Sequence, residues 1–270
     1  MTMADGCLNF DTNINSEGFE KGLKSLSDMV GDIKPKLKSL AMAVTAAFSV
    51  KKLVDFGRQS IETASDLAEV QNVVDTAFGE SKQKMEDFAD TAVKTYGISK
   101  LTAKQTGSNF MAMAAGMGLA NDSASDMAVA LTGLSADMAS FYNVGQDVAS
   151  TALKSIFTGE TETLKQFGIV MTDANLQAYA LSKGITKSTA DMSQAEKVQL
   201  RYNYVMSQTA LAQGDFAKTS DSWANQTRIL SEQWKEFGAT IGTVLMNVLL
   251  PAVKAINSLL SQLIALAQGA

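Results

Sequence analysis

The chain has 270 residues, of which 46% are hydrophobic, so it carries enough apolar mass for a packed core. Aromatic residues make up only 7%, and there are only two prolines, a composition that favours long helices over strands. A formal net charge of −5 argues against a nucleic-acid-binding protein, and no nucleic acid is expected as a partner of the folded domain. We therefore predict an all-α fold, a multi-helix and partly extended bundle with long amphipathic helices.

The residue types needed for most catalytic sites are scarce. The sequence has no histidine and a single cysteine, Cys7, which removes histidine-based triads, cysteine–histidine dyads and thiolate zinc sites. No glycine-rich phosphate loop is present, and Glu160 and Glu162 would point to different faces of a helix. A serine–lysine pair is the route that the sequence leaves open. We predict that the chain is not an enzyme, with no catalytic residue, cofactor or metal.

Residues 1–56 are expected to form an N-terminal arm followed by amphipathic helices. The segment Cys7–Phe10 predicts a short strand or an extended arm. The first residues lack a basic stretch and an apolar stretch, so no secretory signal is expected. An apolar stripe at spacings of three and four starts at Phe19 and predicts helix, with Pro35 interrupting it or opening the next helix.

Residues 57–220 show helical stripes separated by glycine-containing breaks. Ser99 is a predicted N-cap, and Ser193 with Glu196 predicts a capping box. The segment Asn109–Leu119 is rich in Met, Ala and Gly, which fits either core packing or an adaptable binding surface. The clearest stripe predicts one amphipathic helix and consists of Met127, Leu131, Leu134, Met138 and Phe141.

Residues 221–270 are expected to form a long C-terminal helix pair. Pro251 should kink or end the first helix near Leu250. Apolar residues recur along that helix at spacings of three and four, which predicts a heptad-like seam for self-association. We call this set the seam; it comprises Leu230, Trp234, Phe237, Ile241, Leu245 and Val248.

A second function class is a membrane-active helical protein that acts at the bacterial envelope. The segments Ala41–Val50 and Ala239–Leu266 would then insert into a bilayer. The most apolar stretch, Ala239–Val253, is shorter than the roughly 20 residues that a spanning helix needs, and it contains Asn247 and Pro251. Liposome co-sedimentation and dye release discriminate this class from a purely structural protein.

Several segments are more specific than helix formation requires, and their order and spacing form a pattern over about residues 60–255. This pattern resembles the conserved N-terminal helical region of phage tail tape-measure (minor tail) proteins. The segments are Val73–Ser81 (VVDTAFGES), Tyr96–Gln105 (YGISKLTAKQ), Met111–Leu119 (MAMAAGMGL), Leu131–Asn143 (LTGLSADMASFYN), Phe157–Thr172 (FTGETETLKQFGIVMT) and Gln213–Gln226 (QGDFAKTSDSWANQ).

The resemblance implies a structural role in the virion. Several copies of such a protein lie inside the tail tube during assembly and set the tail length, and the tape is later ejected and aids DNA entry. The implied partners are further copies of the chain, tail-tube and tail-tip proteins, tail-assembly chaperones and a transient membrane contact. The implied location is the phage tail, after synthesis in the host cytoplasm.

Members of this family are usually much longer and carry extended ruler regions. The chain is accordingly expected to be a fragment, a degraded prophage product or the head domain of a longer protein. The many glycine breaks favour a folded helical domain over a straight rod.

Overall fold

A computed structural model describes residues 50–268 of the chain. The chain divides into two compact units, residues 1–56 and 57–270, and the second is described here by itself. The expected strand at Cys7–Phe10, the helices after Phe19 and residues 41–49 of the candidate membrane segment lie outside the described residues. The boundary expected at residues 220 and 221 stays a prediction.

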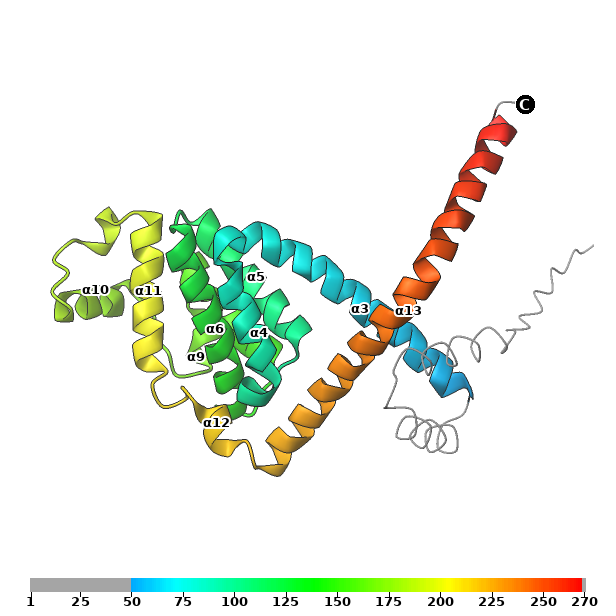
Figure 1. The fold of residues 1–270 in the computed structure, drawn as a ribbon. Coiled ribbons are helices and arrows are strands. Elements are labelled where there is room, and N and C mark those ends of the chain that lie inside the picture. The colour runs from blue at the N-terminus through cyan, green and yellow to red at the C-terminus, as the bar shows by residue number, and fades with distance from the viewer. Residues whose placement is uncertain (1–49, 269–270) are drawn as a thin grey trace, which may run out of the picture. The chain divides into compact units, whose positions relative to one another are not determined.

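The described residues form helices and contain no strand, which confirms the all-α prediction for this part of the chain (Figure 1). The elements in chain order are α3 (Val50–Phe78), η2 (Gly79–Ser81), α4 (Lys82–Tyr96), α5 (Lys100–Gly116), α6 (Asn121–Phe141), α7 (Gln146–Leu153), α8 (Ser155–Thr158), α9 (Glu162–Lys165), α10 (Asp173–Ser182), η3 (Thr189–Asp191), α11 (Gln194–Gln208), α12 (Asp215–Thr219) and α13 (Trp223–Gln268).

Helix α6 lies at the centre of the core, where it packs against α4, α5, α7 and α12. Its predicted stripe is confirmed except at its end, because Met127, Leu131, Leu134 and Met138 are buried while Phe141 is 44% exposed. Burial of each such side chain contributes about 1.5–3 kcal/mol. Small buried residues between them let neighbouring helices approach α6 closely; they include Ala124, Ala128, Thr132, Ser135 and Ala139.

The Met-rich segment of α5 serves mainly as core. Phe110, Met111 and Ala114 are at most 1% exposed, and Phe110 lies against Phe157 with ring centroids 6.1 Å apart. Phe157 belongs to α8, so this ring contact joins α5 to α8 within the core. Of the two interpretations of this segment, core packing is the one that the buried side chains support.

The local capping signals are confirmed. Ser99 caps α5 by accepting the backbone N–H of Thr102, and Ser193 caps α11 by accepting that of Glu196. The Glu196 carboxylate returns to the N–H of Ser193 at 2.7 Å, which completes the predicted capping box. These bonds satisfy N–H groups that the first turn of a helix leaves without backbone partners.

The expected C-terminal helix pair is instead one helix, because α13 continues through Pro251 to Gln268. A proline inside a helix removes one backbone hydrogen bond, here to the carbonyl of Asn247. Both residues are exposed, so water can satisfy that carbonyl. The flanking run of Leu, Val and Ala keeps the helix formed on both sides. No helix in the described part of the chain is both long and apolar enough to cross a membrane.

Candidate interaction surface

The seam predicted from the sequence lies on α13, and the side chains in the first half of it are partly exposed. Leu230 is 65% exposed, Trp234 53% and Phe237 39%, and the rings of Trp234 and Phe237 lie against each other with centroids 5.6 Å apart. Ile241 and Leu245 are partly buried, and the side chain of Val248 lies outside the described residues. Trp223, in the same stripe about two turns before Leu230, is 85% exposed.

Helix α13 has two faces with different roles. At about 100° per residue, the seam residues fall within about 40° of one line along the helix. On the same wheel, Glu232, Ala239 and Gly242 lie about 100–180° away. Ala239 and Gly242 are buried, and the Glu232 side chain is only 12% exposed. One side of α13 therefore packs on the helical body, and the seam lies on the other.

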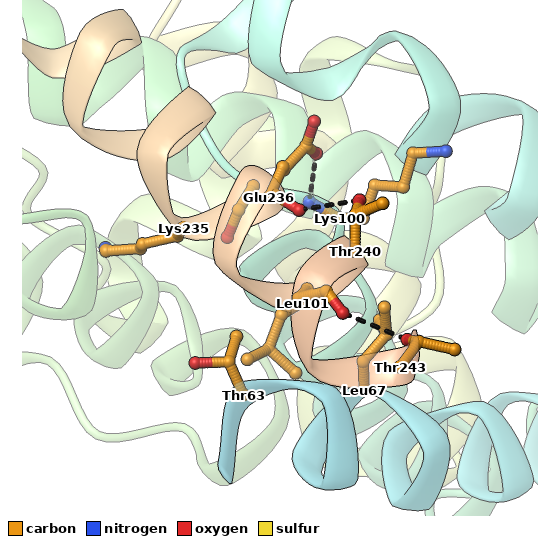
Figure 2. A pocket seen from close by; sticks show the side chains of 10 residues that line it. Thr63, Leu67, Lys100, Leu101, Lys235, Glu236, Thr240 and Thr243 are labelled. Atoms are coloured by element: carbon orange, nitrogen blue, oxygen red, sulfur yellow. Dashed lines mark hydrogen bonds between the residues drawn. The ribbon is translucent and has the colours of Figure 1, made fainter. Parts of the chain in front are cut away.

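Two glutamates attach α13 to the start of α5. Glu232 accepts the backbone N–H of Ser99 at 3.1 Å, and Glu236 accepts that of Lys100 at 3.0 Å. Figure 2 shows the Glu236 carboxylate reaching the backbone of Lys100, while the Lys100 side chain points away. The Lys100 ammonium instead bonds to Asp90 at 2.6 Å, which raises the pKa of Lys100. A carboxylate is stabilised near the N-terminal end of a helix, where the helix dipole is positive. The two bonds therefore fix α13 against the start of α5.

A cavity of about 320 Å³ lies beside this attachment, between α3, the start of α5 and α13. Thr63 and Leu67 line it from α3, and Thr240 and Thr243 line it from α13. Both threonine hydroxyls of α13 donate to carbonyls of their own helix, so they are engaged locally. Two lysines also line the cavity, and each is paired with a carboxylate at 2.6 Å, Lys100 with Asp90 and Lys235 with Glu232.

A close crossing of α13 and α3 forms the other half of the attachment. A Cβ atom at Gly242 would overlap the carbonyl oxygen of Ser60 and come within 2.9 Å of the Ala64 Cβ. Gly238, one turn earlier, is looser, because a Cβ there would meet only the Ser60 hydroxyl oxygen at 3.5 Å. Small residues on both helices thus let the two backbones touch.

Two of the specific sequence segments meet at Asp137 of α6. This side chain is buried, and it accepts the backbone N–H groups of Gly214 at 2.8 Å and Phe216 at 3.2 Å. Burial raises the pKa of Asp137, against the opposing effect of these two bonds. The carboxylate thereby caps α12 from another helix and pins the segment that leads into α13.

The start of α13 is fixed by the same pair of segments. Asn225 is 4% exposed, and its amide donates to the Ser140 hydroxyl at 3.1 Å and to the Thr219 hydroxyl at 2.8 Å. The Phe216 ring covers Gly97, where any Cβ would overlap it. Three of the segments in the sequence resemblance, residues 96–105, 131–143 and 213–226, therefore contact one another.

The described residues contain no group of three or more His, Cys, Asp or Glu side chains that is placed to hold a metal ion. The charged pair Lys104 and Glu86, at 2.6 Å, is mostly buried and also engages Gln71, so it ties α5 to α4 and α3. No protein-family model matches the chain, and neither a curated protein nor a solved structure matches it.

The sequence predicted the seam but not the contacts that attach the opposite side of α13 to the other helices. In the sequence, Glu232 and Glu236 are simply charged residues that lie off the seam, and nothing there predicts their partners or the close approach at Gly242. The backbone N–H groups bound by Glu232 and Glu236 lie 133 and 136 residues earlier in the chain. The spacing of small residues Gly238 and Gly242, four apart, was the one available signal for a close helix crossing.

Proposed function

We propose that the chain is a structural protein of the phage tail, a tape-measure protein or a piece of one, that self-associates through the seam of α13. The observation that carries the self-association is the two-faced character of α13: carboxylates and glycines hold one side on the helical body, and large apolar side chains project from the other. The tape-measure role rests on the sequence resemblance.

The chemistry of the seam fits a second copy of the chain. Trp223, Leu230 and Trp234 give a stripe of large apolar side chains at heptad-like spacing, the pattern by which helices pair with like helices. Burial of exposed aromatic and leucine side chains against another apolar surface lowers the free energy, because it removes apolar area from water. Several copies side by side inside a tube would bury these stripes against one another.

The self-association is tested by adding charge to the seam. The double variant Trp234→Asp and Ile241→Asp should lower the molar mass measured by light scattering after size exclusion, because carboxylates buried between helices lack compensating partners. The matched control is Ser231→Asp with Gln233→Asp, which adds the same charge to exposed positions about 80° from the seam. Equal masses for the seam variant and the wild-type chain would reject the seam as an interface.

The tape-measure role is tested separately, by the reading frames that flank the gene. Tail-tube, tail-tip and assembly-chaperone genes beside it, with a longer open frame, are the expected result. Co-expression with the neighbouring tube protein should then yield a complex that survives size exclusion. A gene that stands alone among genes without virion functions would overturn this role and leave the self-association result intact.

A further inference from the structure

A pocket of about 450 Å³ opens between α10, η3 and α11, away from the residues that attach α13. This volume lies in the range of about 300–1,000 Å³ typical of sites for small ligands. Its lining combines two cations, one carboxylate, one hydroxyl and two leucines; these are Lys197, Arg201, Asp173, Thr189, Leu176 and Leu200.

The two cations stand on one face of α11. Lys197 and Arg201 are four residues apart, so they are neighbours on the helix surface, where like charges destabilise a helix. Neither forms an ion pair within 4.0 Å with any residue of the described part of the chain. Burial lowers the pKa of Arg201, against the opposing charge of Asp173. An oxyanion between the two cations would relieve both effects.

The guanidinium of Arg201 is held in place by the end of α8. Its Nη1 lies 3.5 Å from the carbonyl oxygen of Ile156 and 3.4 Å from that of Phe157, and both carbonyls accept from it. A Cβ at Gly159 would lie 2.7 Å from Nη2, so only glycine leaves room for this placement. Among the residues that the structure describes, Nε and Nη2 have no hydrogen-bond acceptor. A fixed guanidinium with donors to spare loses little freedom when it binds a carboxylate.

We propose that this pocket binds the carboxylate of an aspartate or glutamate side chain in an acidic segment of a partner protein. With Asp173 beside two cations, the site carries one net positive charge, which matches a singly charged carboxylate better than a doubly charged phosphate. Leu176 and Leu200 supply apolar walls for the methylene groups of such a side chain. This site is independent of the seam on α13, so either can fail without the other.

The test uses the full chain and a dye-labelled peptide with two glutamates, followed by fluorescence anisotropy at low salt. The same peptide with glutamines in their place should not bind. Lys197→Gln should weaken binding about tenfold, because one charge-assisted hydrogen bond is lost. Asp173→Asn should strengthen it about threefold, because a like charge near the bound carboxylate is removed. Arg201 is left unchanged, since it also holds α8.

The control is Lys183→Gln, which removes a cation at the end of α10 that lies over the Tyr179 ring and does not line the pocket. It should leave the affinity unchanged. Circular dichroism melts show that each variant is folded. The proposal is overturned if the glutamate peptide does not bind, or if Lys197→Gln and Asp173→Asn leave its affinity at the wild-type value. A rise in the melting temperature of the wild-type chain with millimolar inorganic phosphate, together with no binding of the peptide, would also overturn it, in favour of a free-anion site.

Discussion

The crossing of α13 and α3 makes opposite predictions for two glycines that stand one turn apart. Substitution of Gly238 by alanine should stabilise the protein, and the same change at Gly242 should destabilise it. Both residues are buried in the same helix, so the intrinsic helix propensity changes equally in the two variants. Any difference between them therefore reports the contact with α3.

The magnitudes follow from what each new methyl group would meet. An alanine in a helix interior is worth up to about 1 kcal/mol over glycine. At Gly238 the methyl group would make an ordinary contact of 3.5 Å with the Ser60 hydroxyl oxygen, so most of this gain is retained. At Gly242 it would overlap the Ser60 carbonyl, which is backbone and has no rotamer to change. Overpacking costs about 1–3 kcal/mol, and an overlap with rigid backbone belongs at the upper end of this range. After the propensity gain, the net effect should be a loss of about 2 kcal/mol.

Urea unfolding followed by circular dichroism gives the free energy of unfolding of each variant. Hydrogen exchange at the amides of Ser99 and Lys100 adds a local readout, since Glu232 and Glu236 protect these amides only while α13 is attached. Gly242→Ala should accelerate their exchange, and Gly238→Ala should not. Equal stabilisation by both substitutions, with unchanged exchange, would refute the close crossing of the two helices.

Two further predictions concern buried and capping carboxylates. Asp137→Ala should lower the free energy of unfolding by about 2–4 kcal/mol in urea titrations, because it leaves two backbone N–H groups at the start of α12 without acceptors. The exposed Asp221→Ala serves as the control, and a loss within about 0.5 kcal/mol for both would contradict the capping role. Glu196 has a pKa lowered to about 2 by the Lys187 ammonium and by the N–H of Ser193. A lowered pKa adds stability above the ordinary value of 4.5. Thermal melts of the wild-type chain should therefore lose their advantage over Glu196→Gln as the pH falls from 4.5 towards 2, and a pH-independent difference would contradict this.

Local sequence patterns determined the helices and many of their ends. The stripe from Met127 to Met138 follows the helical period, so one side must be buried whatever packs on it. The capping box at Ser193 and Glu196 is complete within four residues, and neither partner depends on the rest of the fold. The lack of histidine and the single cysteine narrow the possible chemistry through composition alone, because they remove whole classes of nucleophile and metal ligand.

The tertiary structure decided which surfaces are covered and what lies between the helices. The seam was visible as a period, but only the attachment through Glu232, Glu236 and Gly242 determines which side of α13 remains exposed. Pro251 was expected to separate two helices, yet the helix continues, because an exposed carbonyl can bond to water. The spacing of Lys197 and Arg201 in the sequence did not predict a binding site, because the pocket that they line also needs residues of α10 and η3. These contacts join residues far apart in sequence, and their partners are chosen by the packing of the whole unit, which no local period encodes.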